Sequence, residues 1–283
     1  DVGDSYSGVI SLDLRNLNKV LEIDKESRAA RIQAGIFGPA LEEELKKSNL
    51  TLRHFPQSFE HSTLGGWIAT RSGGHFATLY THIDDFVEST TMVTPTGVIE
   101  SRRLPGSGAG PSPDRMVIGS EGILGVITEA WMRLQERPSF RASCPVLFDD
   151  YDKALNATRL ISQSALFPAN CRLLDANEAL FNGAGDGSKN LLILSFESAD
   201  HEMDTWLNRA LEIASDEGGQ FEIPQEKKVD AHKSGASGTW RNSFIRAPYY
   251  REASVRRGVI QDTFETSITW DKGFEFIKIL KEK

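Results

Sequence analysis

Two glycine-rich segments carry the residue types that bind phosphate groups and flat aromatic ligands. The first, residues 56–74, reads PQSFEHSTLGGWIATRSGG. Ser62 or Thr63 is expected to cap a short helix whose first turn holds Gly65 and Gly66, so that backbone N–H groups face a ligand as in an anion site. A glycine turn that only packs a helix on a sheet would need the same residues, and the segment alone leaves both interpretations open.

The second segment, residues 119–128, reads GSEGILGVIT and places three glycines directly before an apolar strand. Glycines at this spacing let the main chain pass within contact distance of a flat or phosphorylated ligand, because a Cβ would hold the ligand off. A β-bulge would need the same glycines. The segment matches neither the GxGxxG dinucleotide motif nor the GxxxxGK[ST] phosphate loop.

Composition narrows the class of protein. With 32 Lys and Arg against 40 Asp and Glu, the net charge is −8, which argues against a nucleic-acid partner. The chain lacks an apolar stretch near the ~20 residues that cross a bilayer. We therefore expect a soluble intracellular protein, and peripheral membrane contact stays open.

The two cysteines, Cys144 and Cys171, form no CxxC pair and have no histidine cluster at metal-ligand spacing beside them. We expect two buried thiols and no metal. The six histidines are scattered singly; His61 and His75 flank the first glycine segment and are expected to be hydrogen-bonding scaffold residues.

The elements expected to position these segments fall into two groups, divided near Arg137-Pro138. The first group consists of antiparallel strands at 9–12, 20–23 and 30–34, a helix at 39–48, a hairpin of 86–94 and 97–102, and a strand at 123–134. The second alternates between strands and helices, at 143–148, 151–164, 170–174, 175–181, 191–196, 200–216 and 220–223. This alternation indicates an α+β or α/β second domain.

Taken together, the two glycine segments and their separation of roughly sixty residues resemble the flavin-binding domain shared by vanillyl-alcohol oxidase, D-lactate dehydrogenases and alkyldihydroxyacetonephosphate synthases. The resemblance implies FAD as cofactor and an α+β fold. Residues 1–137 would form a partial PCMH-type FAD-binding domain, and residues 138–283 a substrate or cap domain with an antiparallel sheet.

The resemblance also implies which residues line the FAD site. They are Pro56, Gln57, Ser58, Phe59, Glu60, His61, Ser62, Thr63, Gly65, Gly66, Thr70, Arg71, Ser72, Gly73, Glu121, Gly122, Ile123, Leu124, Gly125, Val126 and Ile127.

Three details resemble the synthase branch of this family. The glycine pair continues as GGW followed by a Thr-Arg pair, and residues 263–271, TFETSITWD, resemble an SFETSxPWD stretch. About twenty residues upstream, Ile245-Arg246 resembles an Ile-Arg pair whose arginine contacts substrate. Arg172, in an apolar strand, resembles another arginine of the branch, with a structural partner such as Asp175 and a ligand-side role equally open.

The synthase resemblance implies an ether-lipid enzyme that exchanges the acyl group of acyl-dihydroxyacetone phosphate for a fatty alcohol. It implies lipid substrates, a homodimer, and a cytoplasmic location in bacteria or a peroxisomal one in eukaryotes. Two alternatives remain: an FAD-dependent D-2-hydroxy-acid dehydrogenase or oxidase acting on D-lactate or D-2-hydroxyglutarate, and a non-catalytic relative without FAD.

Two parts of the family pattern are missing from this sequence. The glycine-rich first phosphate loop is absent before residues 9–12, and the tyrosine and histidine run expected after residue 271 are absent as well. No catalytic acid or base is therefore assigned, and the chain is expected to be truncated at both ends.

Overall fold

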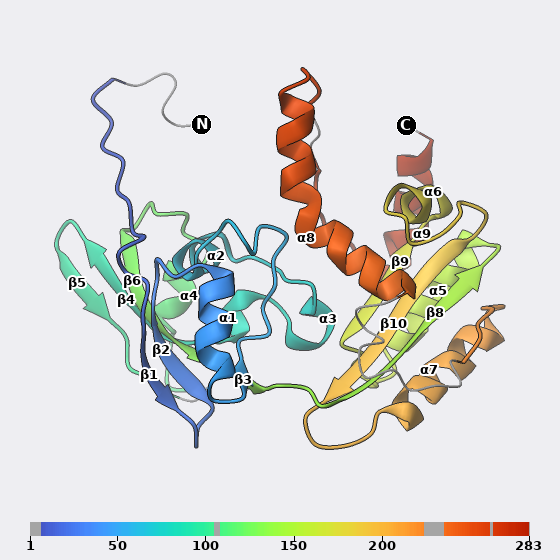
Figure 1. The fold of residues 1–283 in the computed structure, drawn as a ribbon, viewed down its shortest axis with the longest axis horizontal. Helices are drawn as coiled ribbons and strands as arrows, with labels where there is room; N and C mark the ends of the chain where they lie inside the picture. The colour runs from blue at the N-terminus through green and yellow to red at the C-terminus, as the bar shows by residue number, and fades with distance from the viewer. Residues whose placement is uncertain (1–6, 105–107, 224–234, 261–262, 283) are drawn as a thin grey trace. The chain divides into compact units, whose positions relative to one another are not determined.

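The structure is a computed structural model that describes residues 7–104, 108–223, 235–260 and 263–282. The chain forms two compact units (Figure 1). The first contains residues 1–53, 59–72 and 82–136, and the second contains residues 54–58, 73–81 and 137–283. Two short loops from the first half of the sequence, 54–58 and 73–81, thus pack with the second unit.

The first unit is built on a five-stranded antiparallel sheet of order β1-β2-β6-β4-β5. Its strands are β1 (Val20–Asp24), β2 (Ala29–Gln33), β4 (Val87–Thr94), β5 (Gly97–Glu100) and β6 (Val126–Arg133). A separate pair joins β3 (Leu50–Thr51) to β7 (Gln135–Glu136). Side chains alternate between the two faces of the sheet along each strand: Ala130 and Met132 of β6 are buried, whereas Glu129 and Trp131, which alternate with them, are only partly buried.

Short helices accompany this sheet. They are α1 (Gly38–Lys46), α2 (Leu64–Thr70), the 3-10 helix η1 (Ile83–Asp85) and α4 (Asp114–Val117). Helix α1 begins with Pro39 in its first turn, where the missing N–H costs nothing, and buries Leu41 and Leu45. Helix α2 packs against β6 and buries Trp67 and Ile68, which fixes its position on the sheet.

The second unit contains a three-stranded antiparallel sheet of order β8-β10-β9. The strands are β8 (Phe140–Phe148), β9 (Asn170–Leu174) and β10 (Asn190–Ser198). The helices are α3 (Ala77–Tyr80), α5 (Tyr151–Ser162), α6 (Ala176–Phe181), α7 (Asp204–Asp216), α8 (Gly235–Val255) and α9 (Trp270–Lys281). The side chain of Asp150 accepts two backbone N–H groups at the start of α5, and that of Asp175 accepts one at the start of α6.

The two faces of this sheet differ. One face joins the main hydrophobic core with α5 and α7, and both cysteines lie on it because Cys144 and Cys171 are each paired with Leu194 of the central strand. Both thiols are free. Burial raises the pKa of Cys144 to about 11 and that of Cys171 to about 12. The other face carries a smaller apolar cluster with Leu174 and Ile193.

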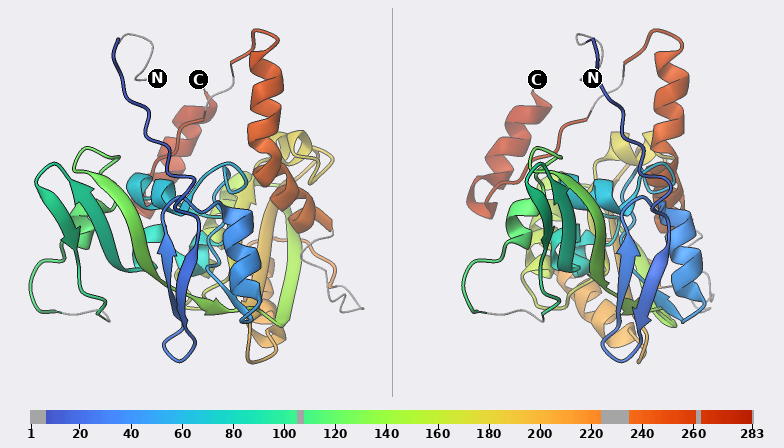
Figure 2. Two further views of the ribbon diagram at one scale, coloured as in Figure 1. Left: turned by 60° about the vertical axis from the view of Figure 1, so that its left-hand side comes forward. Right: turned by 90° about the vertical axis from the view of Figure 1, so that its left-hand side faces the viewer.

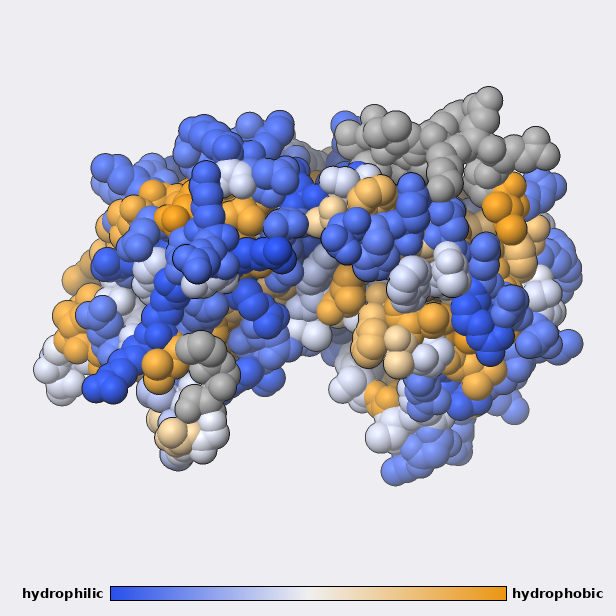
Figure 3. Space-filling view, turned by 90° about the horizontal axis from the view of Figure 1, so that it is seen from below, coloured by the Kyte–Doolittle hydropathy of each residue, from blue (hydrophilic) through white to orange (hydrophobic). Residues whose placement is uncertain are grey.

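Helix α8 is long but not amphipathic, and Pro248 lies inside it. Proline has no N–H to donate to the carbonyl of Phe244 four residues earlier, and the helix bends along its length (Figure 2). Elsewhere on the surface, apolar residues gather in small groups among hydrophilic ones, as the face in Figure 3 shows. Of the helices in the described ranges, none is long and apolar enough to cross a membrane.

The α+β fold class is confirmed, and three predicted elements are corrected. Residues 9–12 are exposed and outside any strand, with Ile10 89% exposed, because a short β-branched run needs a neighbouring strand to pair with. The strand predicted from Ile123 begins only at Val126, since Glu121 and Gly122 have positive φ. Residues 220–223 make a single bridge, Gln220 to Leu147, in place of a strand.

Candidate functional site

The two glycine segments lie side by side in the first unit. The N–H of Gly119 donates to the carbonyl oxygen of Ile68 at 3.0 Å, and the N–H of Glu121 donates to that of Ala69 at 2.9 Å. These bonds satisfy carbonyl groups at the end of α2, where Arg71 closes the helix in the left-handed conformation with φ 54°. Segments fifty residues apart in the sequence thus form one continuous backbone surface.

The glycines of these segments divide into packing and open positions. A Cβ on Gly65 would come within 2.7 Å of the Cβ of Ala34, and one on Gly125 within 2.4 Å of the Val93 carbonyl oxygen. These two glycines allow close packing. A Cβ on Gly66 would meet only the Thr63 hydroxyl, at 3.6 Å, and one on Gly122 would meet open space. Gly66 and Gly122 thus leave backbone open to a ligand.

Two of the three N–H groups in the first turn of α2 are already bonded within the chain. The N–H groups of Leu64 and Gly65 already donate to the carbonyl oxygens of Ile36 and Ala34, at 3.1 and 2.7 Å. Thr63 occupies the cap position without a side-chain hydrogen bond. Leu64 and Gly65 therefore attach the start of α2 to residues 34–36, and the anion site expected there stays a prediction for Gly66.

Ser62 does not cap the helix either. Its hydroxyl accepts the indole N–H of Trp67 at 2.6 Å. The Trp67 ring stacks on Phe59, with ring centroids 6.1 Å apart. This group fixes residues 59–62 on the buried side of α2.

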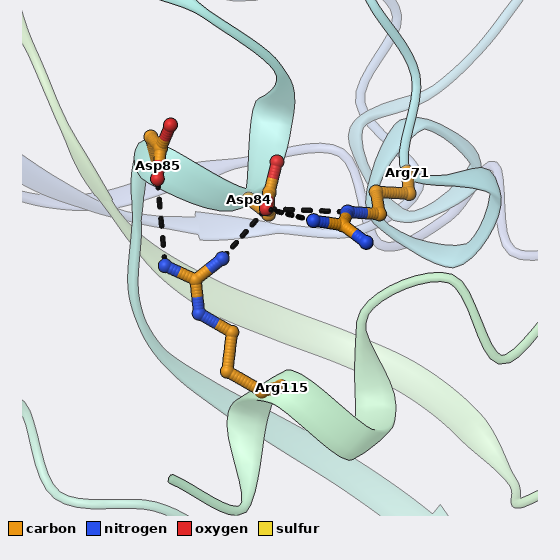
Figure 4. A network of polar contacts seen from close by, with 4 residues as sticks. All are labelled: Arg71, Asp84, Asp85 and Arg115. Carbon is orange, nitrogen blue, oxygen red and sulfur yellow. Dashed lines mark hydrogen bonds and ion pairs between the residues drawn. The ribbon is translucent and has the colours of Figure 1, made fainter. Parts of the chain in front are cut away.

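Arg71 forms part of a charged network at the end of α2 (Figure 4). Its Nε and Nη2 donate to Oδ2 of Asp84 at 3.2 and 2.9 Å, and Arg115 Nη1 donates to the same oxygen at 2.6 Å. Arg115 also reaches Asp85 at 3.4 Å. Asp84 is buried, whereas the Arg71 side chain is 60% exposed, so one carboxylate orients two solvent-facing guanidinium groups.

The turn after Gly119 exposes apolar side chains beside open backbone. The side chain of Ile123 is 84% exposed, and that of Leu124 is also exposed. Gly122, which directly precedes Ile123, has a φ of +83°. Large exposed apolar side chains next to bare glycine are typical of a surface that a ligand or partner covers.

The other predicted cofactor residues are distributed over both units. Phe59 to Thr63, Thr70 to Ser72 and Glu121 to Ile127 belong to the first unit, whereas Pro56 to Ser58 and Gly73 belong to the second. Thr70 donates its hydroxyl to the Gly66 carbonyl oxygen at 3.0 Å. Glu60 and His61 are exposed, and Pro56 and Ile127 are buried.

A second constellation lies on the face of the β8-β10-β9 sheet that carries Leu174 and Ile193. Asn170 and Arg172 alternate with Cys171 along β9 and therefore share the face opposite the main core. The amide nitrogen of Asn170 lies 3.1 Å from Nε2 of His75, and both residues are buried. His75 thus has the scaffold contact expected from the sequence, with a partner 95 residues away.

Aromatic rings from the two short loops and from α8 surround this histidine. Phe55 and Phe76 meet edge-on at 5.9 Å, and His75 lies 5.7 Å from the ring of Phe244 on α8. The Arg241 guanidinium lies 5.8 Å from the Phe55 ring. The sequence pattern did not reveal this cluster, because its members are single residues in unrelated segments.

Arg172 is stabilised by aromatic rings rather than by Asp175. Its guanidinium lies 5.2 Å from the ring of Trp240 and 5.4 Å from that of Phe244. Burial lowers the pKa of Arg172, opposed by the charges of Glu178 and Glu265. Burial and the neighbouring Asp175 raise the pKa of Glu178, and the nearby Arg172 opposes that shift.

Arg246, the predicted substrate contact, lies exposed on α8, between Phe244 and Pro248 in the sequence. Residues 263–269, the rest of the synthase-like pattern, run without regular structure to the start of α9. Within the described ranges, His, Cys, Asp and Glu side chains nowhere gather in a group of three that could hold a metal.

Comparisons with known proteins agree with this arrangement. The family model of the FAD binding domain matches residues 2–101, and that of the FAD linked oxidases C-terminal domain matches residues 137–283. The second match alone covers about half of the chain. The chain belongs to the family of FAD-linked oxidases, and FAD is the cofactor of this family.

Within this family, several relatives that cover most of the chain are alkyldihydroxyacetonephosphate synthases. The chain is 34% identical to an alkyldihydroxyacetonephosphate synthase of Dictyostelium discoideum over 92% of its length and 45% of the relative's. It is 31% identical to an alkyldihydroxyacetonephosphate synthase of Caenorhabditis elegans, in an alignment that covers 97% of this chain and 49% of the relative. The fold is also similar to that of a solved alkyldihydroxyacetonephosphate synthase structure, with a TM-score of 0.79 and 30% sequence identity. The superposition covers 95% of this chain and 51% of the chain of that synthase. The chain thus spans about half the length of these relatives.

The residues of the first unit fit FAD. The backbone is open at Gly66 and Gly122, and Gly122 directly precedes the exposed apolar side chains of Ile123 and Leu124. A flat, partly apolar ring system needs both features.

Proposed function

We propose that this protein is an FAD-dependent alkyldihydroxyacetonephosphate synthase, which exchanges the acyl group of acyl-dihydroxyacetone phosphate for a fatty alcohol. The similarity to such synthases over 92–97% of the chain carries the proposal. The resemblance of residues 263–271 to the synthase pattern supports it independently of the flavin segments.

In this proposal the cofactor contacts of the first unit are those predicted from the sequence, with Gly66, Gly122 and the exposed side chains of residues 121–124 next to FAD. Gly65 and Gly125 contribute indirectly, because they bring α2 and β6 close to their neighbours. Asp84 keeps the Arg71 guanidinium at the end of α2. The division into FAD-binding and substrate domains at residue 137, and the homodimer, stay predictions.

When bound, FAD supplies an electron-accepting and electron-donating ring system for the substrate ketone. The contributions of the chain are binding and orientation. An arginine on α8, Arg246, would hold the substrate phosphate by paired N–H donors, a geometry that lysine cannot reproduce. The aromatic cluster around His75 and Phe244 would exclude water beside it.

A D-2-hydroxy-acid oxidoreductase is the competing function. A glycolate oxidase subunit of Bacillus subtilis is 30% identical over 59% of this chain, and a D-lactate dehydrogenase of Anaerostipes hadrus is 31% identical over 53%. These alignments cover far less of the chain than those of the synthases, which favours the exchange reaction.

The exchange can be tested directly. The protein reconstituted with FAD is incubated with palmitoyl-dihydroxyacetone phosphate and labelled hexadecanol, and the ether product and released palmitate are quantified by mass spectrometry. Equal amounts of both, without an added oxidant or reductant, support the proposal. Absence of the ether product, together with oxidation of D-lactate or D-2-hydroxyglutarate by the same preparation, contradicts it.

A further inference from the structure

A hollow of about 510 Å³ lies on one face of the five-stranded sheet in the first unit. The residues that line it include Trp131 of β6, the directly paired Arg31 of β2 and Ser89 of β4, and Arg103 after β5. The Arg103 guanidinium lies 4.0 Å from the centre of the Trp131 ring. Because small-molecule sites in proteins have volumes of about 300–1,000 Å³, the hollow has the size of a ligand site.

Two hydroxyl groups of β4 line the hollow and make no hydrogen bond to any described residue. Ser89 is only 4% exposed, and its hydroxyl has no such partner in the described part of the chain. The same holds within the described residues for Thr91, two positions farther along the strand. Thr90, between them, points to the other face, where its hydroxyl donates to Asp114 at 2.7 Å. Because buried polar groups are normally hydrogen-bonded, the hydroxyls in the hollow indicate a missing partner.

The charges around the hollow are matched within the protein. Arg31 donates to both carboxylate oxygens of Glu129, at 2.7 and 3.0 Å. Arg103 forms ion pairs with Asp24 and Glu88, each at 2.9 Å. The other two charged residues of the lining have opposite signs; they are Glu100 and Arg102. A phosphate or carboxylate would meet no surplus of positive charge there, so the hollow favours an uncharged ligand.

We infer that this hollow binds an uncharged, hydroxyl-rich ligand, a mono- or disaccharide. A sugar hydroxyl both donates and accepts, so adjacent hydroxyls of a sugar ring can pair with those of Ser89 and Thr91. The flat polar groups of Arg31 and Glu129 offer further donors and acceptors, and the Trp131 ring offers apolar contact to the C–H groups of the sugar. The described residues that line the hollow lie outside both glycine segments, so the inference does not depend on the proposed function.

Saturation-transfer difference NMR on the full chain tests the inference. D-glucose, D-mannose, D-galactose, maltose and sucrose are added separately, and isothermal titration calorimetry gives the dissociation constant of each sugar whose signals appear. Glucose 6-phosphate is the charged counterpart of glucose. We expect at least one sugar to bind with a dissociation constant below about 1 mM, and glucose 6-phosphate to bind no tighter than glucose.

Two variants locate the bound sugar. Ser89→Ala and Thr91→Val each remove one hydroxyl, and each should raise the dissociation constant of the sugar roughly three- to tenfold, as for one hydrogen bond between uncharged groups. Thr94→Val is the matched control on the same strand, because the Thr94 hydroxyl already donates to the Gly97 carbonyl oxygen at 2.8 Å and Thr94 does not line the hollow. This variant should bind the sugar as tightly as the wild type.

The inference is overturned if none of the five sugars binds, or if both hydroxyl variants bind the sugar as tightly as the wild type. Tighter binding of glucose 6-phosphate than of glucose would also overturn it, because the hollow would then be an anion site. Sugar binding by a protein without exchange activity would contradict the proposed function alone. Exchange activity without sugar binding would contradict this inference alone.

Discussion

Asp84 and Arg71 form a buried-to-exposed ion pair, in which one carboxylate oxygen accepts both Nε and Nη2 of the arginine and also Nη1 of Arg115. The pair joins the end of α2 to η1 and α4, and α2 is the helix that carries the open backbone at Gly66. Its removal should therefore loosen the surface that we assign to FAD.

Asp84→Asn should lower the free energy of unfolding by about 1–3 kcal/mol, because the amide oxygen carries no charge for the two guanidinium groups. Asp85→Asn is the matched control. Asp85 is exposed, makes one contact of 3.4 Å in this network, and should change stability by less than about 0.5 kcal/mol. Urea unfolding measures both, and equal effects of the two variants would show that Asp84 does not organise the network.

Gly66→Ala tests the cofactor surface without disturbing the fold. Its Cβ would meet only the Thr63 hydroxyl at an ordinary distance, and alanine in a helix is roughly 0.5–1 kcal/mol more favourable than glycine. We expect unchanged or higher thermal stability together with at least about tenfold weaker FAD binding, measured by flavin fluorescence, because the methyl group occupies the ligand's place. Unchanged FAD affinity would remove Gly66 from the cofactor site.

Gly65→Ala is the companion variant, with the opposite expectation. A Cβ there lies 2.7 Å from the Cβ of Ala34, so the helix must shift and the free energy of unfolding should fall by about 1–3 kcal/mol. Gly122 is less suitable for such a test, because its φ of +83° makes any side chain strained whatever the ligand does.

Both cysteines should be unreactive in the folded protein. Burial raises their pKa to about 11 and 12, so at pH 8 neither thiol forms the reactive thiolate. Iodoacetamide should modify neither residue before denaturation and both after it, as read by mass spectrometry. Rapid labelling of native Cys144 would mean that the main core opens readily.

The same thiols make stability depend on pH in the alkaline range. Because the folded-state pKa is raised above the ordinary value of 9.0, the contribution of each protonated thiol is fully present below pH 9 and is lost as the pH rises toward 11 or 12. For Cys144 the loss is about 2–3 kcal/mol. A Cys144→Ala variant, compared by urea unfolding at pH 8 and pH 10.5, should show a smaller decrease than the wild type.

Arg246→Ala should spare FAD retention and reduce exchange activity by at least about a hundredfold, since it removes paired donors to a phosphate. Arg251 lies exposed on the same helix five residues farther on, which at 100° per residue places it on a different side. Steady-state assays of exchange by Arg246→Ala and Arg251→Ala identify which side of α8 meets the substrate. Full activity of Arg246→Ala would exclude the predicted contact.

Much of the fold follows from the sequence because its signals are local. The hairpin of β4 and β5 and the strands β8, β9 and β10 were predicted near their observed positions, since alternation and turn residues mark them. Helix α8 was not predicted, because its apolar residues follow no helical period and it contains Pro248.

The candidate sites were only partly predictable, because local sequence signals do not show which distant residues meet in the fold. The glycine segments are visible as motifs, yet which glycines are open depends on Ala34 and Val93, far away in the sequence. The contact of His75 with Asn170 and the position of the Arg172 guanidinium 5.2 Å from the Trp240 ring depend on tertiary packing. The sequence around each of these residues does not show which distant residue it contacts.

The most direct test is the visible absorbance spectrum of the protein reconstituted with FAD under anaerobic conditions, recorded with palmitoyl-dihydroxyacetone phosphate and hexadecanol and, separately, with D-lactate and D-2-hydroxyglutarate. The account predicts a flavin band that the hydroxy acids leave oxidised, and ether product in the first mixture. Stable bleaching by a hydroxy acid without ether product would contradict the synthase assignment, and absence of any bound flavin would contradict the cofactor site.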